Sequence, residues 1–315
     1  MALFQSLCEH SDEFVLWVLA LDPPCVTELR RIRDNRLRVV SLTLLEKNCP
    51  ALRACRRTRS LIEYYFTCSP VFIQFVLERL KSGETVTKLD ADGYFFSSPK
   101  KIHELEGKCS LAITPHRFTS NAIAKEIYGK YNVGWVTIRK DRTGILCAEE
   151  WKNKTLAWCR DKPEKNRFAD QKYLDQWPSR YRGVRVLDIP GINQAPWNSE
   201  LSYFKSVKND VFVDEHPLLF FHFHSLRQGE DRKFYANLTE FMIRPNMELV
   251  KKVYIPYVDA ILGVQATYGL SGRNSHVPRH YEDFSYLRRQ SHARHVCSWA
   301  SWNPVQAAEK RAIFF

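Results

Sequence analysis

Short apolar runs alternate with helical segments along the first two thirds of this chain, and this alternation constrains the fold more than any other feature. The runs typical of buried strands span residues 14–21, 37–45, 86–89, 110–114, 133–139, 184–189 and 217–224. Strands separated by helices are typical of a parallel sheet with helices on both faces. We therefore predict an α/β, Rossmann-like fold with a mostly parallel, doubly wound sheet.

Apolar spacing and capping residues predict the helices between these strands. The predicted helices span residues 1–10, 26–33, 51–59, 61–66, 70–80, 98–105, 121–131, 149–160 and 167–174. Ser69 is the expected N-cap of a helix that begins at Pro70. Trp151 and Trp158 are the expected core anchors of the helix at 149–160.

The pattern changes at about residue 262. Downstream of it, arginines and histidines are frequent and aliphatic periodicity is lost. We predict one domain over residues 1–261 and a poorly packed basic tail over residues 262–315.

Composition indicates a soluble protein of the cytoplasm. Of the 315 residues, 44% are hydrophobic, which is enough for a substantial core. The nine cysteines include no Cys-x-x-Cys pair, which favours reduced, buried thiols over disulfides or a zinc site. No apolar run approaches the roughly 20 residues that span a bilayer, and the N-terminus lacks the pattern of a signal peptide.

The formal net charge of +12 favours an anionic partner. Nucleotides, anionic lipid surfaces and nucleic acid all fit this charge, so it does not choose among them. The arginine clusters are also typical of solvated helix faces, which is the alternative interpretation.

Asp90 and Asp92 directly follow the predicted strand at 86–89, where the chain enters a turn that contains Gly93. Ligands of open α/β sheets collect at the carboxyl ends of strands. Two carboxylates there suit a hard divalent cation that keeps other positions free for phosphate oxygens. Two exposed turn acids are the alternative interpretation.

Six segments in order resemble one group of enzymes. They are Thr87–Phe96, Ile113–Phe118, Tyr131–Gly134, Phe168–Leu174, Gly191–Asn198 and Phe220–His224. The first looks like the metal-binding strand end of GT-A glycosyltransferases. Together they resemble bacterial nucleotide-diphospho-sugar transferases related to glycosyltransferase family eight, over residues 2–227.

This resemblance implies a metal site. Asp90 and Asp92 would hold Mn²⁺ or Mg²⁺ against the donor diphosphate, with His222 as third ligand and His224 as the alternative. Such an ion offsets the charge of a leaving nucleoside diphosphate. A packed histidine pair at a strand end is the alternative interpretation for the two imidazoles.

The resemblance also implies residues that contact substrate. Asp170 and Gln171 are the implied catalytic pair beside the transferred sugar, and a place in the first turn of the helix at 167–174 would keep Asp170 ionised. The implied donor-binding or substrate-binding residues are Arg59, Asn132, Asn193, Trp197 and Asn198. Asp170 could instead be a charge at a helix start, and Trp197 could serve loop packing. His116 and Arg117 are left outside the predicted site.

Two features depart from the pattern of that group. The group has a strand ahead of the helix at 1–10 that helps to hold the nucleotide base, and this first strand is missing here. Either the true start lies upstream, or donor binding and activity are impaired. In addition, Lys88 stands where an aromatic residue is common, and Ser225 stands where Gly commonly follows His-Phe-His.

We therefore expect a metal-dependent hexosyltransferase that moves a sugar from a nucleotide-diphosphate donor, a UDP-sugar, to a glycan or lipid-linked glycan acceptor. The resemblance implies retention of configuration and a role in polysaccharide biosynthesis, in the cytoplasm or peripherally at the inner membrane. The alternative is a non-catalytic, degenerate transferase fold or a basic binding protein. Nucleic-acid binding ranks last, because no recognition module is present.

Overall fold

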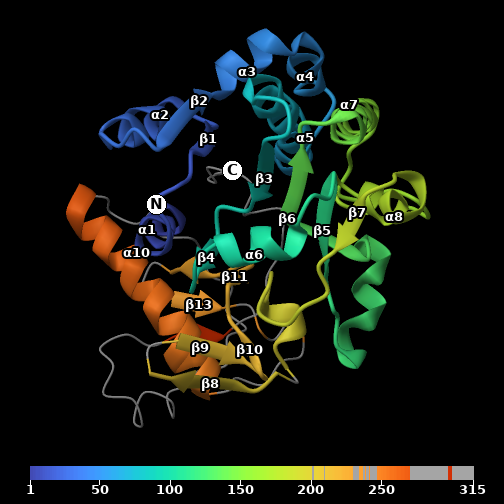
Figure 1. Ribbon diagram of the computed structural model, residues 1–315. Helices are drawn as coiled ribbons and strands as arrows, with labels where there is room; N and C mark the ends of the chain where they lie inside the picture. Colours follow the sequence, from blue (N-terminus) through green and yellow to red (C-terminus); the bar gives the residue numbers. More distant parts are fainter. Residues whose placement is uncertain are drawn as a thin grey trace.

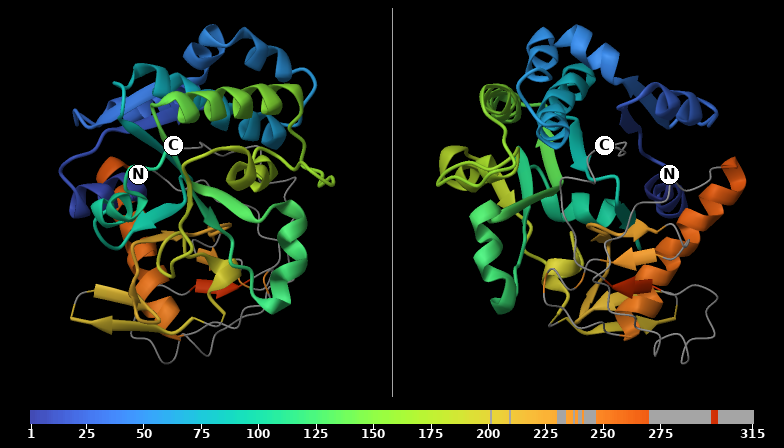
Figure 2. Two further views of the ribbon diagram at one scale, coloured as in Figure 1. Left: turned by 45° about the vertical axis from the view of Figure 1, so that its right-hand side comes forward. Right: turned by 180° about the vertical axis from the view of Figure 1, so that it is seen from behind.

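The computed structural model describes residues 1–200, 202–208, 210–229, 234–236, 238, 241 and 247–269, and the backbone of 297–299. Figure 1 labels the elements, and Figure 2 shows them from two further sides. The α-helices are α1 Ala2–His10, α2 Pro23–Arg30, α3 Leu42–Asn48, α4 Pro50–Cys55, α5 Leu61–Arg79, α6 Lys100–Glu106, α7 Arg142–Ala157, α8 Trp177–Arg180, α9 Met247–Leu249 and α10 Ile255–Tyr268. The 3-10 helices are η1 Ser120–Tyr128, η2 Lys172–Gln176 and η3 Pro196–Asn198, and η5 Val250–Tyr254 is a π-helix.

Most of the strands are short. They are β1 Leu16–Ala20, β2 Leu37–Ser41, β3 Thr85–Leu89, β4 Gly93–Phe95, β5 Leu111–Pro115, β6 Tyr131–Arg139, β7 Val184–Val186, β8 Phe204–Val207, β9 Asp210–Val213, β10 His216–Pro217, β11 Phe220–His222, β12 Arg227–Gln228, β13 Phe234–Ala236 and β14 Cys297–Trp299.

A four-stranded sheet in the order β3-β6-β5-β7 forms the middle of the molecule (Figure 1). β6 is antiparallel to both β3 and β5, whereas β5 and β7 are parallel. The α/β prediction is confirmed in this coarse sense, but the described central sheet is mixed rather than mostly parallel. The return from β5 through η1 reverses the direction of the chain, so β6 pairs antiparallel with its predecessor.

β1 and β2 form a separate parallel pair. Within the described residues no backbone hydrogen bond joins β1 to β3. A cavity of about 180 Å³ lies between these two strands and α5, with Trp17, Phe72 and Val86 in its lining. The sheet is therefore interrupted between β1 and β3.

One long helix, α5, replaces the two helices predicted at 61–66 and 70–80. It begins with a capping box between Ser60 and Glu63 and continues through Pro70. Ser69 is therefore not an N-cap. Buried residues on both sides of the proline, such as Tyr64 and Phe72, offset the hydrogen bond that Pro70 removes.

The helix predicted at 149–160 also has different bounds. α7 begins after Asp141, whose carboxylate accepts a hydrogen bond from the backbone N–H of Gly144, so this helix starts earlier than predicted. Trp151 is a buried anchor of α7, but Trp158 is only half-buried and its ring lies against Arg167.

The chain after residue 200 builds a second layer of small, mostly antiparallel strands below the central sheet (Figure 1). The strand predicted at 217–224 is divided into β10 and β11, and β11 pairs with β4. α10 runs along this layer, where Tyr257 stacks on Phe223 with ring centroids 3.9 Å apart. The domain boundary predicted after residue 261 falls inside α10, and most of the predicted tail lies outside the described residues.

Among the described residues, no helix combines the length and the apolar character needed to cross a membrane. The cysteines in the described part of the chain are all free thiols.

Candidate functional site

The turn that follows β3 presents Asp90 and Asp92. The backbone N–H of Gly93 donates to the carbonyl of Asp90 at 3.0 Å and closes the turn, and β4 begins at Gly93. A Cβ atom at Gly93 would lie 2.2 Å from the ring of Phe220 on β11. Glycine is therefore required for the close approach of β4 to β11.

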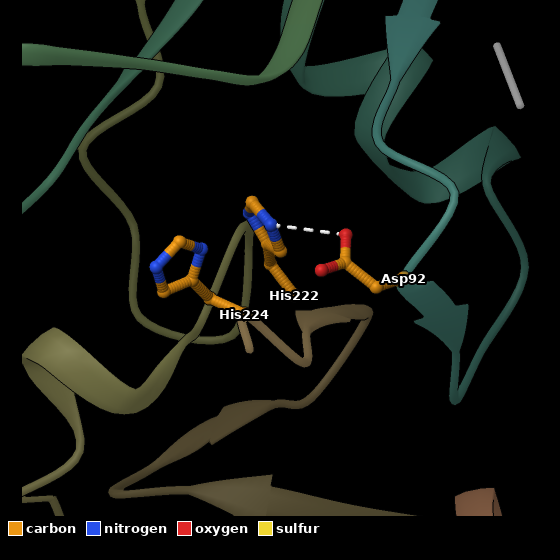
Figure 3. Close-up of side chains that lie close together, drawn as sticks. All are labelled: Asp92, His222 and His224. Carbon is orange, nitrogen blue, oxygen red and sulfur yellow. Dashed lines mark ion pairs between the residues drawn. The ribbon is translucent and has the colours of Figure 1, made fainter. Parts of the chain in front are cut away.

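The pairing of β4 with β11 brings His222 to the two aspartates. His222 lies opposite Gly93 in the register, and the next backbone N–H, of Phe223, donates to the carbonyl of Asp92 at 2.8 Å. His222 Nε2 is 3.2 Å from Asp92 Oδ1 and 3.6 Å from Asp90 Oδ2. Figure 3 shows the imidazole facing Asp92, with His224 beside it.

Burial of His222 lowers its pKa, but the carboxylates of Asp92 and Asp90 outweigh burial, so the pKa is raised above its usual value. Its buried Nδ1 has no hydrogen-bond partner in the described part of the chain. Ligand atoms of Asp92, His222 and His224 lie within 4.8 Å of one another. One carboxylate and two imidazoles form a donor set that suits a divalent metal ion.

Asn132 and Asn193 form an amide network beside His222. Asn132 Oδ1 accepts hydrogen bonds from the backbone N–H of Gly134 at 2.7 Å and from Asn193 Nδ2 at 3.0 Å. A Cβ atom at Gly134 would lie within 3.0 Å of Asn132 Oδ1, His222 Nδ1 and Asn193 Oδ1. The absent side chain of Gly134 thus leaves three polar atoms around one small space.

Asn193 Oδ1, like His222 Nδ1, is buried without a hydrogen-bond partner among the described residues. Buried polar atoms are normally paired, so two such atoms in one place indicate a position for a bound polar group.

Gln171 is hydrogen-bonded into the same network. Its Oε1 accepts from Asn132 Nδ2 at 3.2 Å, and its Nε2 donates to the carbonyl of Tyr128 at 3.2 Å. The structure therefore brings the predicted Asn132, Asn193 and Gln171 together.

Asp170 is not in the first turn of an α-helix as predicted. A 3-10 helix begins only at Lys172, and Ala169 has a positive φ of 45°. Asp170 is 2% exposed, and burial raises its pKa to about 6; the positive charge of Lys88 opposes this rise and Asp90 adds to it. Asp170 therefore lacks the helix N-terminus that was expected to keep it ionised, and burial raises its pKa instead.

His116 was left out of the predicted site, yet it lies inside it. Its Nε2 is 3.1 Å from Asn132 Nδ2, and its ring stacks on Phe118 at 4.5 Å. Burial lowers the pKa of His116 to about 3, so the imidazole is neutral at physiological pH. Its position directly after β5 was the available signal, because side chains at the carboxyl ends of strands gather at one edge of a sheet.

The loop around η3 forms one wall of the site. The Trp197 ring lies edge-on to His222 and His224, at centroid distances of 5.1 and 5.5 Å. Asn198 holds this loop, since its Oδ1 accepts from the Ala195 N–H at 2.9 Å and its Nδ2 donates to the His116 carbonyl at 2.9 Å. These contacts give Asn198 a positioning role, while Trp197 faces the two histidines.

Arg59 is held by α5 and α7. Its guanidinium donates to the Thr67 hydroxyl and, at 2.6 Å, to the Leu156 carbonyl. Among the described hydrogen bonds of Arg59 none reaches Asp90, Asp92 or His222. Its role in donor binding stays a prediction.

Comparison with known proteins identifies relatives but no activity. No family model matches the chain. It is 28% identical to the uncharacterized protein YfnD of Bacillus subtilis (strain 168) over 261 residues, which are 82% of this chain and 83% of YfnD. It is 29% identical to the uncharacterized protein YfnF of the same organism over 235 residues, which are 72% of this chain and 77% of YfnF.

Proposed function

We propose that this protein is a metal-dependent glycosyltransferase that moves a sugar from a nucleotide-diphosphate donor, a UDP-sugar, to a glycan acceptor. One observation supports this proposal most. Asp92, Asn132 and His222 belong to segments far apart in the sequence, and they lie at a place where His222 Nδ1 and Asn193 Oδ1 are buried without a hydrogen-bond partner among the described residues. The six ordered segments that resemble GT-A glycosyltransferases contain these same residues.

We also propose that the core is a GT-A-like sheet. Asp90 follows the carboxyl end of β3 and His116 follows that of β5, which supports a ligand site at this edge.

In the proposed site, Asp92 and His222 hold Mn²⁺ or Mg²⁺ together with Asp90 or His224. When bound, such an ion supplies positive charge that offsets the charge of the departing nucleoside diphosphate. The distance between His222 Nε2 and Asp92 Oδ1, and the ligand atoms of Asp92, His222 and His224 within 4.8 Å of one another, support this fit.

The uncharged groups of the site suit sugar hydroxyls. Asn132, Asn193 and the neutral His116 offer hydrogen-bond donors and acceptors without charge, next to Gln171. Asp170, once ionised, is proposed to orient a hydroxyl or to stabilise positive charge that develops on the sugar ring. Retention of configuration is part of the proposal on the basis of the resemblance.

The proposed acceptor is a glycan or lipid-linked glycan of polysaccharide biosynthesis, used in the cytoplasm or at the inner membrane surface. The net charge of +12 supports contact with anionic lipid headgroups.

The test is release of UDP from a panel of UDP-sugars in the presence of Mn²⁺. Asp92→Asn is expected to lower the rate by about a hundredfold or more, because the interaction with the leaving group is lost. Glu215→Gln, at an 85% exposed side chain in the turn between β9 and β10, is the matched control and should leave the rate unchanged. Equal rates for wild type and Asp92→Asn would show that the metal assignment is wrong.

A non-catalytic nucleotide-binding protein is the second candidate, and the interrupted sheet between β1 and β3 favours it. Calorimetry separates the two candidates. Tight UDP binding that ignores Mn²⁺, with no turnover of any UDP-sugar, supports the non-catalytic protein.

A further inference from the structure

Lys88 is a buried cation inside the acidic site. It lies near the end of β3, two residues before Asp90, and the two side chains are in contact. Lys88 is 2% exposed, and its Nζ lies 2.5 Å from Asp90 Oδ1. A buried ammonium is costly unless it is paired, so this short ion pair ties Asp90 to Lys88.

Asp92 lies on the other side of Asp90 in the chain and faces the histidines instead. Its Oδ1 is nearer to His222 Nε2, at 3.2 Å, than Asp90 Oδ2 is, at 3.6 Å. The group whose ligand atoms lie within 4.8 Å of one another comprises Asp92, His222 and His224, and it does not include Asp90 (Figure 3).

The positive charge of Lys88 also makes the two aspartates differ as metal ligands. A divalent cation at Asp90 would lie next to the positive charge of Lys88, which repels it at short range in a buried site. A cation held by Asp92, His222 and His224 would use the carboxylate that faces the histidines rather than the one paired with Lys88.

We propose that the metal ligands of this protein are Asp92, His222 and His224, and that Asp90 is a positioning residue paired with Lys88. This inference rests on the metal-dependent function proposed above, and it departs from the ligand set that the Asp-x-Asp pattern implies. Two imidazoles and one carboxylate favour Mn²⁺ and later transition ions over Mg²⁺.

Binding of Mn²⁺ alone, measured by the loss of the free-ion electron paramagnetic resonance signal, tests the proposal without any turnover. Asp92→Asn and His224→Asn are expected to weaken binding by about tenfold or more, whereas Asp90→Asn changes it by less than about threefold. His224 is half-exposed, so its substitution perturbs the core least and keeps the test informative even if Asp90→Asn fails to fold.

Lys88→Met supplies a second comparison. Removal of the neighbouring cation frees Asp90 and lowers the repulsion, so Mn²⁺ is expected to bind about threefold more tightly or better. Circular dichroism melts of each variant show whether the fold is retained.

Selectivity gives an independent measurement on the wild type. A tenfold excess of Mg²⁺ is expected to leave Mn²⁺ bound, whereas Zn²⁺ at about equal concentration displaces it.

Three results would overturn the assignment. They are equal losses in Asp90→Asn and Asp92→Asn, unchanged binding in His224→Asn, and ready displacement of Mn²⁺ by Mg²⁺. Absence of Mn²⁺ binding by the wild type at millimolar concentration is a different result, because it contradicts the metal-dependent function itself.

Discussion

At the scale of single residues, Asp170 is the acid whose behaviour depends most on burial. Its pKa rises from 3.8 to about 6 because the carboxylate is removed from water, although Lys88 partly compensates. An acid with a raised pKa in the folded state ionises more easily in the unfolded chain. Ionisation of Asp170 therefore favours unfolding. The contribution of Asp170 to the free energy of unfolding decreases as the pH rises from about 4 to about 6.

From this shift we expect Asp170 to lower the free energy of unfolding by about 2 kcal/mol between pH 4.5 and pH 7.5. Asp170→Asn lacks the titrating group, so its stability relative to the wild type should increase by that amount over the same interval. Urea denaturation of both proteins at the two pH values measures the difference. An identical pH dependence in the two proteins contradicts the raised pKa.

At the scale of elements, two strands of three residues each determine where His222 lies. β4 and β11 pair antiparallel, and the Phe95 and Phe220 rings pack at 4.9 Å where the strands meet. A Cβ atom added at Gly93 would lie 2.2 Å from the Phe220 ring, so the pair leaves no room for a side chain there. The geometry of the candidate metal site therefore depends on one short strand pair.

Gly93→Ala is expected to destabilise the protein by about 1–3 kcal/mol, because the added methyl group meets the Phe220 ring. The methyl group is expected to displace β11 and, with it, His222. Mn²⁺ binding should therefore weaken as well. Thermal melts and the Mn²⁺ titration measure both effects.

Gly263→Ala is the matched control. Gly263 lies inside α10 with open space at its Cβ position, so alanine should stabilise that helix by about 0.5–1 kcal/mol and leave Mn²⁺ binding unchanged. Loss of Mn²⁺ binding in both variants would mean that the effect at Gly93 is not specific to the β4–β11 pair.

At the scale of the whole molecule, a strongly basic chain encloses an acidic site. The net charge is +12, whereas Asp90, Asp92 and Asp170 lie together near the edge of the central sheet. The site is built where the central sheet meets the lower layer, with β3 and β6 on one side and β11 on the other (Figure 2). Binding through the overall charge and binding at the site should therefore respond differently to salt.

Between 50 and 500 mM NaCl we expect the affinity for UDP with Mn²⁺ to change by less than about tenfold, because the proposed contacts are mainly buried. Any binding to double-stranded DNA should fall by about a thousandfold or more over the same range, because it depends on counterion release. Fluorescence anisotropy with labelled UDP and DNA compares the two. A steep fall in UDP affinity that parallels the DNA curve contradicts a specific buried site.

Neighbouring residues in the chain were sufficient to predict α1, β3, β5 and the turn from Asp90 to Gly93, because strand apolarity and turn glycines are local signals. The position of His116 directly after β5 was a further local signal. The antiparallel pairing of β6, the continuation of α5 through Pro70 and the burial of Asp170 were not predictable in this way. Each depends on contacts between segments far apart in the chain, and such contacts arise only when the sheet and the helices pack together.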